Sequence, residues 1–234
     1  MDEKLKIVNI FGGPGCGKST TAAGLYRIMK LEGINVEYVT EYAKDLTWQN
    51  RYDVLERDQL YITAKQNRRL DILRDQVKWV VSDSPILTGF QYMTPEIFGG
   101  DTQIFEKLVL QLWETYDNYN FFLDRKKPYN AVGRSQSERE AKVIDKNLHD
   151  MLLRYKIPYT QIDGDENASE NIWKELPRYR SSSLFWPEQD HMIFLGFSLP
   201  KDGCGDKWCD TECDECKKAW EDYKILRDDL SDGC

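Results

Sequence analysis

A glycine-rich stretch near the N-terminus carries the clearest chemical signal in the sequence. Residues 12–19 read GGPGCGKS and match G-x-x-x-x-G-K-[ST], the pattern of a phosphate-binding loop. In such loops the backbone N–H groups face phosphate oxygens, and the following helix N-terminus adds partial positive charge. We expect Lys18 to reach the β- and γ-phosphates and the Ser19 hydroxyl to bind Mg²⁺. The predicted nucleotide-binding residues are Gly13, Gly15, Cys16, Gly17, Lys18, Ser19 and Thr20.

The elements that flank this loop are those that its chemistry requires. Residues 5–11 form an apolar run rich in β-branched side chains, which favours a buried strand. Residues 19–32 place apolar side chains at roughly helical spacing. Because strand, loop and helix follow one another in the order of a true phosphate-binding loop, a chance match in a glycine-rich turn is disfavoured.

Two carboxylates follow predicted strands and are candidates for chemistry beside the loop. Glu41 follows a strand predicted over 35–39, and Asp83 follows a short apolar strand over 79–81. The carboxyl ends of parallel strands form the edge at which α/β folds bind ligands. Glu41 is interpreted as a general base or metal-shell ligand, the alternative being an acid that stabilises a helix N-terminus. Asp83 is predicted to hold Mg²⁺, the alternative being a cap on the turn before Pro85.

The most basic stretch of the chain spans about residues 124–140, after a strand predicted over 120–123. It also contains Gly and Pro, and we expect it to form a mobile lid above the phosphate loop. Its arginines would neutralise charge on the transferring phosphoryl group and exclude water, unless they are surface residues paired with nearby glutamates. The candidate arginines are Arg125, Arg134 and Arg139.

The rest of the pattern alternates strands and helices. Ser137 and Glu140 have the spacing of a capping box. Further helices are predicted over 42–76, 101–116, 142–155 and 168–176, and a fifth strand over 158–162. Five short strands alternating with helices predict an α/β fold, a three-layer sandwich around a five-stranded parallel sheet. We assign residues 1–177 to this domain and residues 178–234 to a C-terminal extension.

Cysteines mark the C-terminal extension, because five of the six lie after residue 200. Four thiolates there could bind Zn²⁺ tetrahedrally. Only the last two form a C-x-x-C pair, whereas common zinc modules contain two such pairs, so free thiols and a redox or iron–sulfur role stay open. The four candidate zinc ligands are Cys204, Cys209, Cys213 and Cys216.

The composition excludes several classes of protein. With 41% hydrophobic and 31% charged residues, the 234-residue chain has the values of a globular protein. It has no apolar run of about 18 residues, and its charged N-terminus is unlike a signal peptide, so we expect no membrane partner and a cytoplasmic location. The net charge of −8 argues against broad binding to duplex nucleic acid, although a local basic channel remains compatible.

These motifs resemble those of small P-loop kinases. The group includes ribosylnicotinamide kinase domains and many phage proteins labelled only as AAA-family ATPases, although the chain lacks the strand ending in Asp-Glu that suits that label. The resemblance implies a P-loop kinase fold, ATP as donor, Mg²⁺, a nucleoside-like acceptor and, for a phage-encoded chain, the host cytoplasm. The group also includes phage enzymes resembling 5-hydroxymethyluracil DNA kinases. The matching stretches are residues 12–19, 39–43, 82–85 and 125–134.

The sequence therefore predicts an ATP-dependent kinase whose acceptor is the hydroxyl of a nucleoside or nucleotide. One alternative is a kinase that acts on 5-hydroxymethyluracil within phage DNA, and another is an ATPase switch with a protein partner. An oligomer is compatible with the sequence. The predicted catalytic residues are Lys18, Glu41, Asp83, Arg125, Arg134 and Arg139, and the predicted Mg²⁺ ligands are Ser19 and Asp83.

Overall fold

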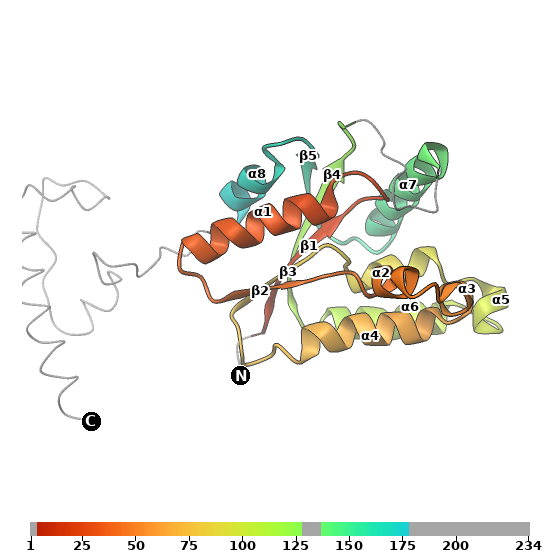
Figure 1. Ribbon diagram of the computed structural model, residues 1–234. Helices are drawn as coiled ribbons and strands as arrows, with labels where there is room; N and C mark the ends of the chain where they lie inside the picture. Colours follow the sequence, from red (N-terminus) through yellow and green to blue (C-terminus); the bar gives the residue numbers. More distant parts are fainter. Residues whose placement is uncertain (1–3, 128–136, 178–234) are drawn as a thin grey trace, which may run out of the picture. The chain divides into compact units, whose positions relative to one another are not determined.

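The fold was analysed in a computed structural model, which describes residues 4–127 and 137–177. This part of the chain is a three-layer α/β sandwich, with helices on both faces of a central sheet (Figure 1). The predicted fold class is confirmed. Within the described residues, no helix combines the length and the apolar character that crossing a membrane demands.

The sheet has five strands, all parallel, in the order β2-β3-β1-β4-β5. The strand β1 is central and almost wholly buried, as its apolar sequence predicts. From β1 the chain first crosses to β2 on one side, and all later crossovers run in the opposite direction, so the carboxyl end of β1 is the switch point at which such sheets bind ligands. The strands are β1 Lys6–Phe11, β2 Val36–Val39, β3 Trp79–Ser82, β4 Asp117–Asp124 and β5 Thr160–Asp163.

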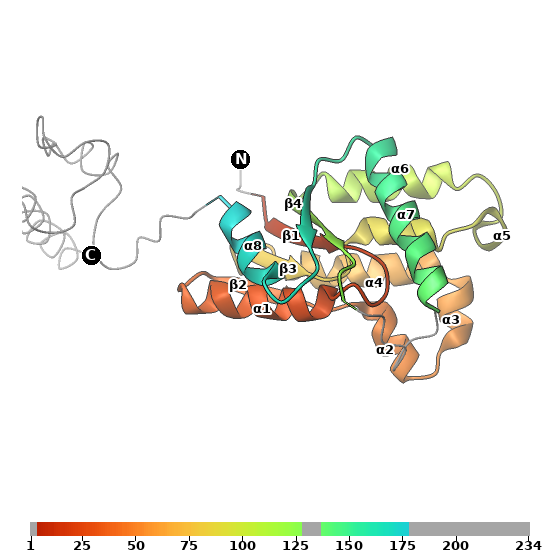
Figure 2. The same cartoon turned by 90° about the horizontal axis from the view of Figure 1, so that it is seen from above.

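The helices divide between the two faces of the sheet. One face carries α1 Lys18–Leu31 and α8 Ala168–Glu175, which lie side by side (Figure 2). The opposite apolar layer packs against the sheet and includes residues of α4, η1, α6 and α7. The elements of that side are α2 Tyr42–Trp48, α3 Tyr52–Arg57, α4 Gln59–Asp71, η1 Ile86–Gln91, α5 Pro95–Phe98, α6 Gln103–Trp113 and α7 Glu138–Arg154.

Two apolar layers hold the sandwich together because successive strand residues point to opposite faces. Ile7 and Phe11 of β1 pack with Leu148 of α7, whereas Val8 and Ile10 pack with residues of α1 and α8. All five of these side chains are at most 2% exposed. The phosphate loop therefore begins at the end of a strand that is held on both faces.

The predicted single helix over 42–76 is wrong, since this segment forms three helices. Asn50 adopts a left-handed backbone conformation, with φ of 56°, between α2 and α3. Asp58 then starts α4, because its side chain accepts a hydrogen bond from the Tyr61 N–H at 3.0 Å. The stretch between the strand predicted over 79–81 and the helix predicted over 101–116 also contains η1 and α5. In contrast, the predicted capping box of Ser137 and Glu140 is confirmed at the start of α7.

Candidate active site

The phosphate loop joins β1 to α1 and has the backbone shape that its glycines predict. Gly12 and Gly17 have φ of 142° and 107°, values that side chains other than glycine rarely allow. A side chain on Gly12 would also collide with the Cys16 sulfur. Among the described residues, no side chain caps the N-terminus of α1, and its first turn has no acid. Its N–H groups can therefore face an anion.

Lys18 and Cys16 lie on opposite sides of this loop. The Lys18 ammonium donates a hydrogen bond to the Gly13 carbonyl at 3.1 Å, which keeps positive charge on the loop. The Cys16 side chain is 1% exposed and packs in the apolar layer with Val8 and Ala22. Only the backbone of Cys16 can therefore contribute to the nucleotide site predicted for it.

Asp83 lies at the end of β3, next to the loop, and is 4% exposed. Its Oδ2 accepts a hydrogen bond from the Tyr38 hydroxyl at 2.9 Å, and Tyr38 also interacts with the Ser19 hydroxyl. Its Oδ1 is buried with no hydrogen-bond partner in the part of the chain that the structure describes. The turn before Pro85 is instead bridged by the Ser82 hydroxyl, which accepts from the Ser84 N–H at 3.3 Å.

The environment of Asp83 fits a cation. A buried carboxylate oxygen without a partner is costly, and Mg²⁺ prefers oxygen ligands of this kind. Burial, followed by the charge of Asp83, raises the pKa of Tyr38, so this phenol stays protonated as a donor at neutral pH. Ser19 and Asp83 stay the predicted Mg²⁺ ligands, and the buried Oδ1 of Asp83 is compatible with that role.

Glu41 is the second carboxylate at this edge of the sheet. It occupies the N-cap position of α2, but within the described residues its side chain makes no capping hydrogen bond. It interacts electrostatically with Lys18 and Asp83. Burial raises the pKa of Glu41, Asp83 acts in the same direction, and the Lys18 ammonium opposes both. These features disfavour a purely capping role for Glu41.

Tyr92, which follows η1, interacts electrostatically with Glu41. Burial, with a smaller contribution from Glu41, raises the pKa of Tyr92 to about 12. The phenol is therefore neutral at physiological pH and can donate a hydrogen bond.

Among the lid arginines in the described part of the chain, only Arg125 has a side chain that lies against the phosphate loop. Its Nη2 and Nε lie 2.9 and 3.0 Å from Oδ2 of Asp145 on α7. Oδ1 of the same carboxylate accepts a hydrogen bond from the Gly13 N–H at 2.5 Å. Arg125 and Asp145 are only 10% and 19% exposed. One carboxylate thus joins Arg125, α7 and the phosphate loop.

The remaining lid arginine in the described part of the chain, Arg139, lies on α7. It is exposed and lines an open groove of about 830 Å³ with Lys142 and Lys146. The nearby Glu138 pairs with Lys142 at 2.8 Å, and Glu140 belongs to the capping box. Arg134 and the four candidate zinc ligands lie outside the described residues.

Sequence reasoning missed several residues of this site. Tyr38 reads as an ordinary strand residue, and Asp145 lies on a helix whose polar face carries many charges. Gln66 lies in a polar run, residues 65–69, that reads as a solvated helix face. Of these residues, only Tyr38 had a signal in the sequence. The alternation of β2 leaves Tyr38 on the face opposite Val39.

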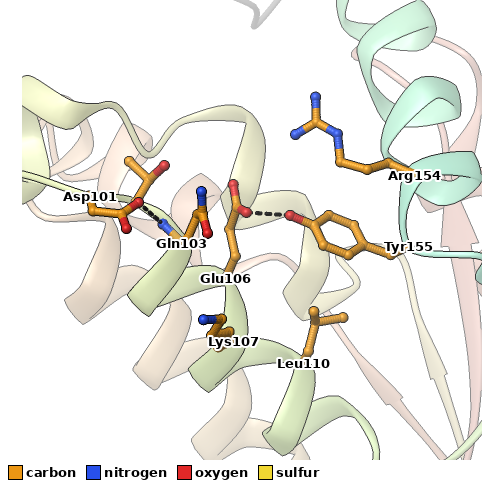
Figure 3. Close-up of a pocket in the computed structure, with 8 residues that line it drawn as sticks. Asp101, Gln103, Glu106, Lys107, Leu110, Arg154 and Tyr155 are labelled. Atoms are coloured by element: carbon orange, nitrogen blue, oxygen red, sulfur yellow. Dashed lines mark hydrogen bonds between the residues drawn. The ribbon is translucent and has the colours of Figure 1, made fainter.

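A separate pocket of about 380 Å³ lies between α6 and the end of α7 (Figure 3). The hydroxyl of Tyr155 donates a hydrogen bond to the Glu106 carboxylate across it, with Arg154 and Lys107 alongside. None of the predicted site residues in the described part of the chain lines this pocket. It is therefore distinct from the edge of the sheet that carries the phosphate loop.

The loop, the parallel sheet and the carboxylates at its edge define a P-loop nucleotide-binding protein. The chain belongs to the AAA domain family, whose model matches residues 7–168. The expectation that this label fits the chain poorly is therefore wrong, because the model of that family covers most of the chain. No curated protein matches the chain in sequence.

Several solved structures are similar in fold. Deoxyadenosine kinase from M. mycoides with bound dATP has a TM-score of 0.48 and 18% identity, over 74% of this chain and 100% of that one. Thymidylate kinase from Ehrlichia chaffeensis has a TM-score of 0.46 and 16% identity, over 73% and 96%. Mycobacterium tuberculosis APS kinase, in complex with AMPPNP and APS, has a TM-score of 0.42 and 15% identity, over 74% and 96%.

Proposed function

We propose that the protein is an ATP-dependent kinase that transfers the γ-phosphoryl group to a hydroxyl of a nucleoside or nucleotide. The observation that carries this proposal is the pairing of the phosphate loop with Glu41. This carboxylate interacts with Lys18 and Asp83, makes no capping hydrogen bond within the described residues, and has a raised pKa. A nucleotide-binding loop alone would suit an ATPase switch, whereas a carboxylate with these properties suits a base for an acceptor hydroxyl.

In this proposal, phosphoryl transfer depends on position and charge more than on covalent participation by the protein. Lys18 and the loop N–H groups hold the β- and γ-phosphates. Ser19 and Asp83 would hold Mg²⁺, which when bound would neutralise charge on the phosphate oxygens. Arg125, fixed beside the loop by Asp145, adds positive charge to the same region.

Glu41 orients the acceptor and removes its proton. The acceptor oxygen forms a bond to the γ-phosphorus, the bond from that phosphorus to the β–γ bridging oxygen breaks, and ADP leaves. The hydroxyl proton passes to Glu41, whose raised pKa makes it a stronger base than an ordinary carboxylate. Tyr92 interacts electrostatically with Glu41, and we assign its neutral phenol the role of a hydrogen-bond donor to the acceptor.

The test is transfer of labelled γ-phosphate from ATP to a panel of acceptors. The panel contains nucleosides, ribosylnicotinamide, nucleoside monophosphates, and DNA with and without hydroxymethylated pyrimidine. Label on one small molecule supports the proposal. Label on modified DNA alone favours the DNA kinase, and release of labelled phosphate with no labelled acceptor favours an ATPase switch.

A further inference from the structure

One buried glutamine of α4 holds the backbone on both sides of Glu41. Gln66 is 4% exposed. Its Oε1 accepts a hydrogen bond from the Tyr42 N–H at 2.8 Å, and its Nε2 donates to the Thr40 carbonyl at 3.3 Å. The peptide group before Glu41 and the peptide group after it are therefore tied to the same side chain.

Arg69, one turn further along α4, strengthens this attachment. Its Nη1 donates to the Thr40 carbonyl at 3.0 Å and contacts the Thr40 hydroxyl at 3.2 Å. The same guanidinium forms an ion pair with Asp45 of α2 and lies over the Tyr42 ring, 5.2 Å from its centroid. The segment that carries Glu41 is thus bound to α4 through backbone, charge and ring contacts.

These contacts determine where the Glu41 carboxylate lies. Glu41 has φ of −64° and ψ of 121°, and no capping bond within the described residues restrains its side chain. The direction of that side chain therefore depends on the two peptide groups that Gln66 holds. Glutamine suits this role because its amide is both acceptor and donor, whereas a carboxylate could not donate to the Thr40 carbonyl.

We propose that Gln66 is a positioning residue for Glu41, an inference that rests on the proposed kinase function. Gln66 touches neither nucleotide nor acceptor and acts through the backbone of residues 40–42. Misplacing a reacting group by about 1 Å can cost a factor of about 100 in rate. Loss of Gln66 should therefore lower kcat and leave KM for ATP nearly unchanged, because the phosphate loop belongs to β1 and α1.

The chain offers a matched control on the same helix. Gln59 is 5% exposed, and its Nε2 donates at 2.8 Å to the Leu55 carbonyl, away from Glu41. Gln66→Leu and Gln59→Leu remove the same chemical group from similarly buried positions. We expect both variants to melt at lower temperature, and only Gln66→Leu to lose about 10- to 100-fold in kcat.

A second variant keeps the test valid where Gln66→Leu does not fold. Gln66→Glu retains size and the acceptor for the Tyr42 N–H but loses the donor to Thr40. It should lower kcat while Gln59→Glu does not. In Gln66→Leu, which adds no charge, the acid limb of the pH–rate profile should move to lower pH, because a less confined Glu41 loses part of the burial that raises its pKa.

The Glu41→Gln background separates failure of this inference from failure of the proposed function. In the supporting result, Glu41→Gln is slow and adding Gln66→Leu slows it no further. If Glu41→Gln is slow but Gln66→Leu matches Gln59→Leu in kcat, the positioning role of Gln66 is overturned, whereas the proposed kinase function still stands. If Glu41→Gln transfers phosphate at the wild-type rate, the base itself is wrong, and the role of Gln66 is overturned with it.

Discussion

Replacing Asp145 with asparagine removes the negative charge that faces Arg125 and changes little in shape. The side chain of Arg125 is 10% exposed and that of Asp145 is 19% exposed, so water screens their interaction only weakly. Removing one partner from a buried ion pair costs about 3–5 kcal/mol. Since this pair is not fully enclosed, we expect a loss of about 3 kcal/mol in the free energy of unfolding.

Urea denaturation of the full chain at neutral pH measures this loss. With an m value of about 2 kcal/mol per molar urea, the midpoint should fall by about 1.5 M. The matched control is Glu37→Gln, which breaks the pair between Lys30 and Glu37, 3.1 Å apart and 40% and 44% exposed. That exposed pair should contribute about 0–1 kcal/mol.

Equal midpoints for Asp145→Asn and Glu37→Gln would refute the reasoning, because burial is the only feature invoked to separate the two pairs. ATP affinity provides a second measurement. In Asp145→Asn the new amide oxygen can still accept from the Gly13 N–H, so affinity should fall less than in Asp145→Ala, which removes both contacts.

The remaining predictions concern catalysis, pH and the C-terminal extension. Lys18→Ala should abolish transfer while leaving the far-UV circular dichroism unchanged, and near-normal turnover would contradict the mechanism. Glu41→Gln should lower kcat far more than ATP affinity, with the reverse pattern assigning Glu41 to nucleotide binding. For the wild type, kcat should fall as acidification protonates Glu41, with a midpoint above the ordinary carboxyl pKa of 4.5. The same raised pKa means that charged Glu41 disfavours folding, so Glu41→Gln should raise the melting temperature at neutral pH, a gain that vanishes below the unfolded-state pKa. Metal analysis tests the zinc hypothesis: about one Zn²⁺ per chain, lost in Cys213→Ser, would support it, whereas zinc-free protein that melts unchanged with a chelator would remove it.

Local sequence determined the elements whose causes are local. The phosphate loop could be located because its glycines, lysine and serine act through neighbouring backbone, between a buried strand and a helix. Ser137 and Glu140 predict the start of α7 because each bonds to the backbone of the other. Glu41 and Asp83 could be placed at the carboxyl edge, since each directly follows an apolar run.

The error over residues 42–76 shows where local pattern stops being sufficient. No Gly or Pro interrupts that segment, yet Asn50 takes a left-handed conformation and Asp58 starts a new helix. Helical propensity is weak for each residue, so packing of α4 against η1 and the sheet edge can override it.

Only the tertiary structure decided which polar groups meet. Tyr38 and Asp83 lie 45 residues apart, Gly13 and Asp145 lie 132 apart, and Gln66 reaches Tyr42 across 24. No spacing rule links such residues, because parallel strands and their crossover helices bring them together. The sequence by itself determined where phosphate can bind, since that site is made of contiguous backbone. The tertiary structure decided how the surrounding carboxylates are held, since each depends on a partner from a distant element.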